Sequence, residues 1–406
     1  MKQNNIAGKL LIALSLCVCL AGATPAQQKR KTTRPRPAAT PQNAEQLKAQ
    51  AGRTREAGKI DEAIPLYQKA VAADPAWIDG WWFLGTLHYE RDQYTQGAAA
   101  FQRATALQPK LGAPWAMLGL CEFRIGEFDN ALTHLRLGRK LGVGDNQELG
   151  RVMRYHEGQV LLLKGDFETA QNIFGVLSYD NVMTEDIFIA HGLASLRMAM
   201  LPAQIKADYR DRNLIRRAGF AEHLYAQKNF GDAQREYEQL VTDYPRNPGV
   251  QYAYGKFMID QRNDEAAIAA FLKEIENSPS HALARLQIAY IKLRNREAAD
   301  GLKYAQEAVN LNPRLSLGHY VLGRILHETD QTGEAIAELE VARRLSPNEP
   351  RIYFVLSRAY AKAGRKADAD QARETFARLN KMVEESVAQG NLRGEVINEG
   401  PDKPRP

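Results

Sequence analysis

The chain has 406 residues, of which 25% are charged, 44% apolar and 8% aromatic, an ordinary composition for a folded soluble protein. Its formal net charge of +6 arises at the N-terminus, because seven Lys and Arg residues precede residue 44 without any Asp or Glu, which leaves residues 44–406 at −1. A nucleic-acid-binding domain would be expected to carry a basic face on its folded part, so this balance argues against nucleic acid as a partner. Only Cys121 lies beyond residue 20, which excludes an intramolecular disulfide there.

Residues 1–26 have the pattern of an export signal. Lys2 and Lys9 precede an apolar stretch at 10–20 that is too short to remain as a membrane span. Small residues follow, and they predict cleavage after Ala23 or Ala26. The alternative is an uncleaved signal that holds the chain at a membrane. No second apolar run occurs, so we expect no integral membrane span after signal removal.

Residues 27–43 are rich in Pro, Thr, Ala, Lys and Arg. Such a stretch buries too little apolar surface to order itself and is typical of an extended, disordered linker. A solvated tether is the first interpretation. A weak contact of its basic cluster with an anionic surface is the second.

From residue 44 the sequence repeats with a period of about 34 residues. Leu84-Gly85 recurs as Leu118-Gly119, and Trp81 recurs as Trp115. If this Leu-Gly pair occupies positions 7 and 8, position 8 is small in every copy, and position 20 is Ala or Gly in all copies but the one that begins at 185. Small residues at these positions let two helices approach closely. Position 24 is a large apolar residue in most copies: Tyr67, Phe101, Leu135, Phe174, Tyr237, Phe271 and Leu339.

The residues between these positions predict a helix, a tight turn and a second helix in each copy. Apolar residues recur at three- and four-residue spacing, the helical period. Glycines that favour positive φ mark the turn at Gly58, Gly126, Gly165 and Gly364. The residues expected as the N-caps of second helices are Asp61, Thr95 and Asp129. Pro follows the second helix at 75, 109, 245, 279, 313 and 347.

This joint pattern resembles the tetratricopeptide repeat family over roughly residues 44–384. The resemblance implies an all-α fold, an α-solenoid of about ten helix-turn-helix units coiled into a right-handed superhelix. The units begin near 44, 78, 112, 151, 185, 214, 248, 282, 316 and 350. A pentatricopeptide array, which reads RNA, has a similar period but lacks this set of Gly, Ala and Pro positions.

The register of the repeat is broken near the middle. The unit that begins at 185 has no Ala at position 20 and no Pro at position 32, and Pro202 interrupts it. We therefore predict an N-terminal array at 44–200, an irregular joint at 201–213, and a C-terminal array with a capping helix at 214–389. A disordered tail follows at 390–406. The joint is either a hinge or an insertion without a role, and the sequence leaves both open.

The sequence offers no catalytic constellation. His156-Glu157 and His327-Glu328 each lack the second His of a zinc-protease helix, and no phosphate-binding loop or nucleophile elbow occurs. The scattered His residues lack metal-ligand spacing, and Cys121 is interpreted as a small buried filler. We therefore expect no enzyme activity, no cofactor and no metal.

By resemblance, the first helix of each unit lines a concave groove through positions 2, 5, 9 and 12, and that groove binds a partner peptide or protein. Aromatic and Arg side chains carry most binding energy at interfaces. The predicted partner-binding residues are Trp82, Tyr89, Phe123, Tyr155, Tyr252, Lys256, Tyr290, Tyr320, Arg324, Phe354 and Arg358. The alternative for each aromatic is packing against the helix of the next unit.

These features predict a non-catalytic scaffold or adaptor of the cell envelope. In a bacterium, the export signal and the resemblance together favour the periplasm, with secretion as an alternative. Two other hypotheses are an accessory subunit of an envelope polysaccharide or peptidoglycan enzyme, and a carbohydrate-binding solenoid, because Trp and Tyr also stack on sugars. The identity of the partner is not readable from the sequence.

Overall fold

The computed structural model describes residues 41–388, with side chains described for 43–385. This part of the chain consists of helices, and the all-α prediction is confirmed. The predicted signal at 1–26, most of the linker and the tail at 390–406 lie outside the described residues. The first helix begins at Pro41, inside the predicted linker.

The chain divides into two compact units, and their boundary in the sequence lies between Asp166 and Phe167. We call the described parts the N-unit (41–166) and the C-unit (167–388). The N-unit comprises α1 (Pro41–Glu56), α2 (Ile60–Ala73), α3 (Ile78–Glu90), α4 (Tyr94–Leu107), α5 (Gly112–Ile125), α6 (Phe128–Leu141) and α7 (Gln147–Lys164).

The C-unit begins with α8 (Phe167–Tyr179), α9 (Glu185–Ser195), the 3₁₀ turn η2 (Pro202–Gln204), α10 (Arg212–Ala226) and α11 (Phe230–Asp243). It continues with α12 (Val250–Asp260), α13 (Asp264–Asn277), α14 (Ala282–Arg294), α15 (Ala298–Leu311) and α16 (Ser316–Glu328). It ends with α17 (Thr332–Leu345), α18 (Pro350–Lys362) and α19 (Lys366–Ala388).

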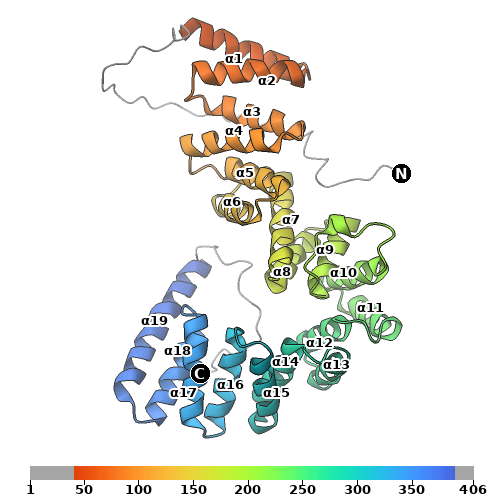
Figure 1. The fold of residues 1–406 in the computed structure, drawn as a ribbon, viewed down its shortest axis with the longest axis vertical. Helices are drawn as coiled ribbons and strands as arrows, with labels where there is room; N and C mark the ends of the chain where they lie inside the picture. Colours follow the sequence, from red (N-terminus) through yellow and green to blue (C-terminus); the bar gives the residue numbers. More distant parts are fainter. Residues whose placement is uncertain (1–40, 389–406) are drawn as a thin grey trace. The chain divides into compact units, whose positions relative to one another are not determined.

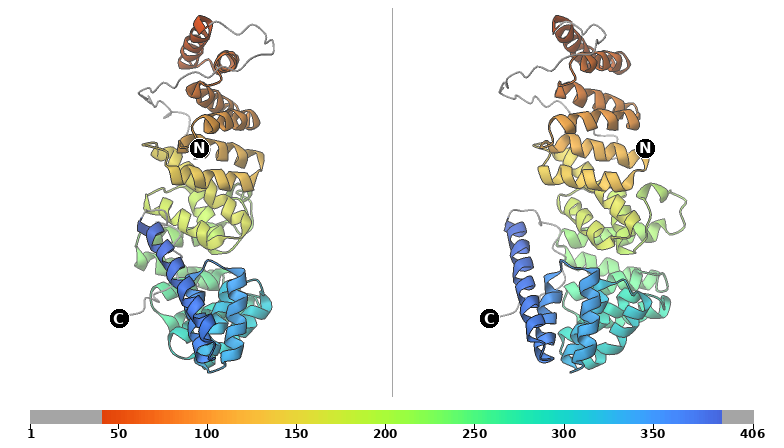
Figure 2. Two further views of the ribbon diagram at one scale, coloured as in Figure 1. Left: turned by 90° about the vertical axis from the view of Figure 1, so that its left-hand side faces the viewer. Right: turned by 60° about the vertical axis from the view of Figure 1, so that its left-hand side comes forward.

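Within each unit, consecutive helices pack in pairs (Figure 1). In the N-unit, α1 packs on α2, α3 on α4 and α5 on α6, and Figure 2 shows these pairs as successive layers of one stack. In the C-unit the pairs run from α10/α11 to α18/α19. We call α1, α3, α5, α7, α10, α12, α14, α16 and α18 the first helices. The second helices are α2, α4, α6, α11, α13, α15, α17 and α19.

The contact that closes four of the pairs is the one predicted from the repeat, between a glycine at position 8 and a large residue at position 24. A Cβ built on Gly85 would lie 2.8 Å from the ring of Phe101, and one on Gly119 would lie 2.8 Å from Leu135. In the C-unit, Gly255 faces Phe271 at 2.6 Å, and Gly323 faces Leu339 at 2.6 Å. The large side chain at position 24 therefore occupies the space that glycine leaves at position 8. Any Cβ at position 8 of these copies would overpack it.

The turn between the helices of a pair needs one residue with positive φ, and the chain supplies it with or without glycine. Gly58, Gly126, Gly165 and Gly364 confirm the prediction for their turns, with φ between 72° and 84°. The corresponding residues in other pairs are not glycine, yet they adopt φ between 56° and 65°: Asp92, Lys228, Arg262, Arg296 and Asp330. The left-handed conformation thus belongs to the repeat geometry and is imposed on residues that disfavour it.

The predicted N-caps were wrong by two residues. Asp61 and Asp129 lie at the second residue of α2 and α6, and the N-cap positions are held by Lys59 and Glu127, without a side-chain cap hydrogen bond. The reason is the tight turn, because the helix begins two residues after the positive-φ residue. Asp61 and Asp129 still favour the helix by lying near the positive end of its dipole.

A repeated hydrogen bond fixes the link between pairs. Trp81 Nε1 donates to the carbonyl oxygen of Pro75 at 2.9 Å, and Trp115 Nε1 donates to that of Pro109 at 2.9 Å. Tyr353 donates to the carbonyl of Pro347 at 2.8 Å in the same way. In each case the Pro carbonyl oxygen accepts a hydrogen bond from a side chain six residues further along the chain. Trp81 also packs against the core of α2 and α3, which is a structural role.

The region predicted as a joint connects two helices that are tightly packed. A Cβ on Gly192 of α9 would lie 1.8 Å from the carbonyl oxygen of Ile215, and one on Gly219 of α10 would lie 1.7 Å from that of Phe188. The backbones of α9 and α10 thus touch through two facing glycines. The division between compact units falls after Asp166, inside the repeat predicted at 151–184. Gly192 allows a close approach, but to α10 rather than to a second helix of its own copy.

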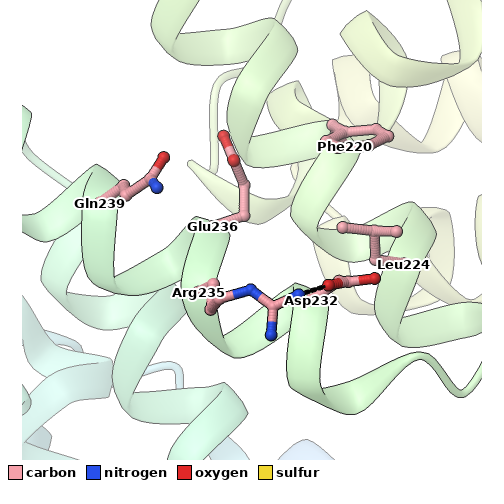
Figure 3. A pocket seen from close by; sticks show the side chains of 6 residues that line it. All are labelled: Phe220, Leu224, Asp232, Arg235, Glu236 and Gln239. Atoms are coloured by element: carbon pink, nitrogen blue, oxygen red, sulfur yellow. Dashed lines mark hydrogen bonds and ion pairs between the residues drawn. The ribbon is translucent and has the colours of Figure 1, made fainter.

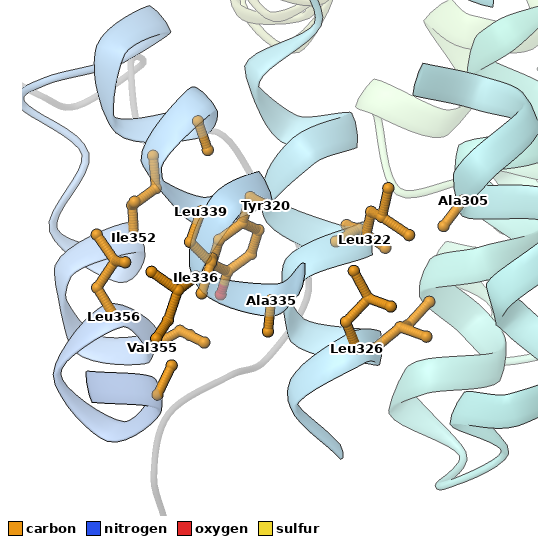
Figure 4. Close-up of a cluster of buried hydrophobic side chains, with 14 of the residues drawn as sticks. Ala305, Tyr320, Leu322, Leu326, Ala335, Ile336, Leu339, Ile352, Val355 and Leu356 are labelled. Atoms are coloured by element: carbon orange, nitrogen blue, oxygen red, sulfur yellow. The ribbon is translucent and has the colours of Figure 1, made fainter. Parts of the chain in front are cut away.

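The C-unit has a continuous apolar core from α14 to α19. Leu322, Leu326, Leu339 and Leu356 are nearly inaccessible, and Figure 4 shows such side chains from successive helices meeting between the layers. Each helix pair therefore depends on its neighbours to bury its apolar side chains. Of the helices described, none combines the length and the apolar content needed to cross a bilayer.

Candidate partner-binding surface

The N-unit holds four of the predicted partner-binding residues, and three of them are half-buried. Trp82 meets Phe101 edge to face at 5.6 Å, and Tyr89 meets Tyr94 at 5.2 Å. Phe123 packs on Phe128 at 5.6 Å. Burial raises the pKa of Tyr89 to about 12, so its hydroxyl stays protonated and is a donor at neutral pH.

Tyr155, Tyr252 and Tyr320 are buried, with 7%, 4% and 6% of their surfaces exposed. Tyr252 lies 4.8 Å from His281 and 5.7 Å from Phe271, ring centre to ring centre. The surroundings of these three residues fit the alternative interpretation, in which the ring packs between neighbouring helices. Their rings hold the helices together and offer a partner little area.

Phe354 and Arg358 of α18 are the most accessible of the eleven. Phe354 is 43% exposed, rests on Phe376 of α19 at 5.5 Å, and has the Arg358 guanidinium 6.0 Å from its ring centre. Lys256, Tyr290 and Arg324 are half-buried. Arg324 lies 5.7 Å from the ring centre of Tyr320. We call the half-buried and exposed members of the eleven the first-helix surface, which the structure places on α3 and α5 in the N-unit and on α12, α14, α16 and α18 in the C-unit.

In the C-unit, positive charge predominates on the first helices and negative charge on the second helices. This difference was not identified from the sequence. The first helices of the C-unit carry eleven Lys and Arg against three Asp and Glu. Its second helices carry nine Lys and Arg against eighteen Asp and Glu. The first helices of the N-unit carry seven of each. Whole-chain charge concealed this separation, and counting by predicted helix could have found it.

Much of the positive charge on these first helices is neutralised by carboxylates of neighbouring segments. Arg217 donates to Glu236 at 2.7 Å, and Arg285 donates to Glu307 at 2.8 Å. Arg358 differs, because the structure gives it no carboxylate partner among residues 43–385. It is an exposed cation beside an exposed aromatic ring.

The pKa of His327, on α16, is affected by the charged side chains around it. Burial lowers its pKa, and the nearby positive charges of Arg358 and Lys362 lower it further, whereas Glu328 and Asp330 oppose them. Its Nδ1 atom is buried without a hydrogen-bond partner in the described residues. The net effect of the four charges and burial disfavours the imidazolium, as expected where cations predominate.

A second feature that the sequence reading missed is a buried polar cluster between α8 and α11. Glu222 accepts hydrogen bonds from Ser195 Oγ at 2.8 Å and from the Tyr237 hydroxyl at 2.5 Å. His191 and His223 are each 1% exposed, and burial lowers the pKa of both. Neither ring nitrogen of His223 has a hydrogen-bond partner among the described side chains and backbone. The cluster is a source of pH-dependent stability.

A shallow pocket lies between α10 and α11 (Figure 3). It is lined by Phe220, Leu224, Asp232, Arg235, Glu236 and Gln239. Its charged groups are engaged locally, because Arg235 pairs with Asp232, and Glu236 accepts from Arg217. The polar groups of the lining are therefore engaged by one another or by Arg217, and they do not converge on a ligand position.

The remaining candidates for chemistry are placed in the interior. Cys121 is fully buried, and burial raises the pKa of its thiol to about 12, so the nucleophilic thiolate is suppressed. Glu157 is fully buried and paired with Arg139 at 3.0 Å, which ties α6 to α7. Within residues 41–388, no three His, Cys, Asp or Glu side chains are grouped to hold a metal ion.

Comparison with known families identifies the repeat. A family model described as tetratricopeptide repeat matches residues 49–111, 83–142, 219–282 and 286–350, more than half of the chain in total. No curated protein matches the chain. The matched segments fall in both units and coincide with the helix pairs described above.

Several solved structures are similar to part of the chain. A crystal structure of MamA is 19% identical, with a TM-score of 0.38, and the match covers 41% of this chain and 96% of that one. MamA from Desulfovibrio magneticus RS-1 is 18% identical, with a TM-score of 0.37 and coverage of 42% and 94%. YrrB, described as a TPR protein with an unusual peptide-binding site, is 15% identical, with a TM-score of 0.37 and coverage of 43% and 93%.

Proposed function

Because the chain belongs to the tetratricopeptide repeat family, we propose that it is a non-catalytic scaffold that binds a peptide or protein partner on its first-helix surface. The observation that supports this most is the periodic presentation of aromatic and Arg side chains there, since residues of these types dominate binding energy at interfaces. Helix pairs that are already packed lose little freedom on binding, so the cost of ordering falls mainly on the partner.

The burial pattern narrows the proposed contact residues. Trp82, Tyr89, Phe123, Tyr290 and Phe354 retain accessible ring area. Lys256, Arg324 and Arg358 supply the positive charge. The three buried tyrosines act indirectly, by holding the first helices in place.

Photo-crosslinking tests this assignment. A photoreactive phenylalanine is placed singly at Trp82 or Phe354, and at Leu272 of α13 as a control, since Leu272 is an exposed apolar residue of a second helix (38% exposed). Irradiation of the full chain in its native cells is expected to give one defined protein adduct from the two first-helix positions and none from Leu272. Equal labelling from both faces, or none from the first helices, would contradict the proposal.

We also propose that the chain is exported to the bacterial periplasm, on the basis of residues 1–26. N-terminal sequencing of the mature protein is expected to begin at residue 24 or 27. Recovery of the chain with its first 20 residues intact in a soluble cytoplasmic fraction would contradict export.

A carbohydrate-binding solenoid is the second candidate, and the half-buried indole of Trp82 is the observation that favours it. Glycan-array binding that is lost in a Trp82→Ala variant would support this candidate. Absence of glycan binding, together with a protein adduct from Trp82, would exclude it.

A further inference from the structure

We propose that the partner segment held by the C-unit is acidic and carries an aromatic or aliphatic side chain, and that it docks on α16 and α18. This inference rests on the proposed function and specifies the chemistry of the partner. Its centre is the patch formed by Arg324, Phe354 and Arg358, which we call the terminal patch, and the buried ring of Tyr320 lies beside Arg324.

The first support is the distribution of charge. The C-unit concentrates eleven Lys and Arg on its first helices, where three Asp and Glu oppose them, and it places the excess of acids on its second helices. The chain between 44 and 406 is nevertheless near neutral. On α18 part of this charge is paired, Arg351 with Glu349 and Lys362 with Asp330. Arg358 has no carboxylate partner among residues 43–385, and an acidic group is the complementary partner for it.

The second support is the combination of cation and ring in the terminal patch. Arg358 lies over the exposed ring of Phe354, and both Arg324 and Arg351 lie within 6 Å of the Tyr320 ring centre, at 5.7 and 5.8 Å. The Arg351 guanidinium is already paired with Glu349 at 2.8 Å, so the edge N–H groups that we expect to meet a carboxylate are those of Arg358. Phe354 then provides the apolar contact beside it.

The third support comes from the titratable groups that face His327. Its neighbours Arg358 and Lys362 outweigh Glu328 and Asp330, and together with burial they hold the pKa of the imidazole below its usual range. Burial is the largest cause of this shift, and the Arg358 guanidinium is the largest of the charges that add to it. A carboxylate that binds to Arg358 would oppose that charge and raise the pKa of His327.

The arrangement favours a peptide over a polyanion. A nucleic-acid backbone or an anionic membrane neutralises many cations arranged in a continuous track. Here Arg217, Arg285, Arg294 and Lys362 are each paired with carboxylates of the protein. The terminal patch instead offers the exposed Arg358 guanidinium beside the exposed ring of Phe354, which matches one carboxylate next to an apolar side chain.

A displayed library of random 12-residue peptides provides the probe. It is selected against the full chain, against Arg358→Glu, and against Arg344→Glu as a matched control. Arg344 is an exposed arginine on the second helix α17, so its reversal changes the net charge equally and leaves the patch intact. Arg358→Lys keeps the charge and tests whether the planar guanidinium is needed.

We expect the full chain and Arg344→Glu to enrich peptides that combine Asp or Glu with Phe, Tyr, Trp or Leu, and Arg358→Glu to lose that enrichment. In anisotropy titrations an enriched peptide should bind Arg358→Glu roughly tenfold or more weakly, as expected for a lost charge-assisted hydrogen bond. In NMR of histidine-labelled chain, the same peptide should raise the pKa of His327, and it should leave the lowered pKa of His156 in the N-unit unchanged.

The possible failures are distinguishable. Enrichment without acidic residues, or an affinity insensitive to Arg358→Glu, would overturn the acidic-partner inference and leave the proposed scaffold standing. No enrichment by the full chain would overturn both. Equal binding of a 12-nucleotide single strand, or of vesicles of phosphatidylcholine with one quarter phosphatidylglycerol, with the same loss in Arg358→Glu, would overturn it in favour of a general polyanion site.

Discussion

The N-unit and the C-unit are built from the same repeat but differ in what their first helices present. Both close their helix pairs through glycine at position 8 and a large residue at position 24, as Gly85 with Phe101 and Gly323 with Leu339 show. The first helices of the N-unit carry balanced charge and half-buried aromatics such as Trp82. Those of the C-unit carry a large excess of Lys and Arg.

Different positions of the repeat determine the fold and the binding surface. Positions 8, 20 and 24 face the interior of the pair, and their restricted chemistry sets the geometry of both units. Positions 5 and 9 face away from the paired helix in part, and they vary between the units. Recognition can therefore change along the chain without a change of fold.

The largest expected effect is at the glycine contact that distinguishes the C-unit. Gly219→Val places a branched side chain where the carbonyl of Phe188 lies 1.7 Å from a Cβ, so α9 and α10 must separate. We expect a loss of more than about 4 kcal/mol in the free energy of unfolding of the C-unit. Hydrogen exchange should show lost protection in α9–α11 and retained protection in α3–α6.

Gly175 provides the matched control, because a Cβ there meets nothing within 4 Å. Gly175→Ala on α8 should be neutral or stabilise the helix by roughly 0.5–1 kcal/mol. If Gly219→Val melted like Gly175→Ala, the α9–α10 contact would be refuted.

The next effect tests what the units share. Gly85→Ala and Gly323→Ala both force a Cβ against the residue at position 24, at 2.8 and 2.6 Å. We expect each to destabilise its own unit by roughly 1–3 kcal/mol, measured by urea denaturation with unit-resolved hydrogen exchange. A cost confined to one unit would show that the interior of the repeat is not equivalent in the two.

Acid should weaken the C-unit more than the N-unit. Burial lowers the pKa of His156 in the N-unit to about 4 and that of His281 in the C-unit to about 4, and the C-unit adds His191 and His223 with lowered pKa values. A histidine whose pKa is lower when folded stabilises the fold above about pH 6.5, and that stability is lost as the pH falls from 6.5 toward the folded pKa.

For a histidine shifted to about 4, the loss is about 1 kcal/mol by pH 5.5. His223→Leu should flatten the pH dependence of the C-unit, because it removes a buried ring whose nitrogens have no partner in the described structure. Thermal melts between pH 7 and pH 5 measure this. An unchanged slope in His223→Leu would remove His223 from the account.

The smallest expected effect tests the cost of positive φ at a non-glycine residue in the turn between paired helices. Arg296 has φ of 65° and Gly126 has φ of 84° at the same place in their turns. Arg296→Gly should stabilise the C-unit by roughly 1 kcal/mol, because glycine accepts positive φ without steric cost. A fall in melting temperature would show that the Arg296 side chain makes a contact that outweighs the strain.

Much of this fold was readable from the sequence because the period fixes which residues face the partner helix. The pairing of Gly85 with Phe101 needs only the positions of two residues in one copy. The contact between Gly192 and Gly219 was not readable, because the period breaks between them and no spacing rule relates the two glycines. The N-cap positions were predicted two residues too late, because Asp is a common N-cap residue and the sequence does not show how long the turn before Asp61 or Asp129 is.

The binding surface was readable in part. The helix and position of each of the eleven residues follow from the repeat, but their burial depends on how closely the neighbouring first helix packs. That is why Tyr252 and Tyr320 are enclosed while Phe354, on the last first helix of the described part, is exposed. The charge separation was present in the sequence, but it becomes visible only when charges are counted by helix.

The most direct test of the central claim is hydrogen exchange of the full chain with and without a peptide from the library selection. We expect the peptide to slow exchange in α16 and α18 and to leave α17 and the N-unit unchanged. We also expect Arg358→Glu to abolish this protection and Arg344→Glu to retain it. Protection on the second helices, or protection that survives Arg358→Glu, would refute docking of an acidic peptide on α16 and α18.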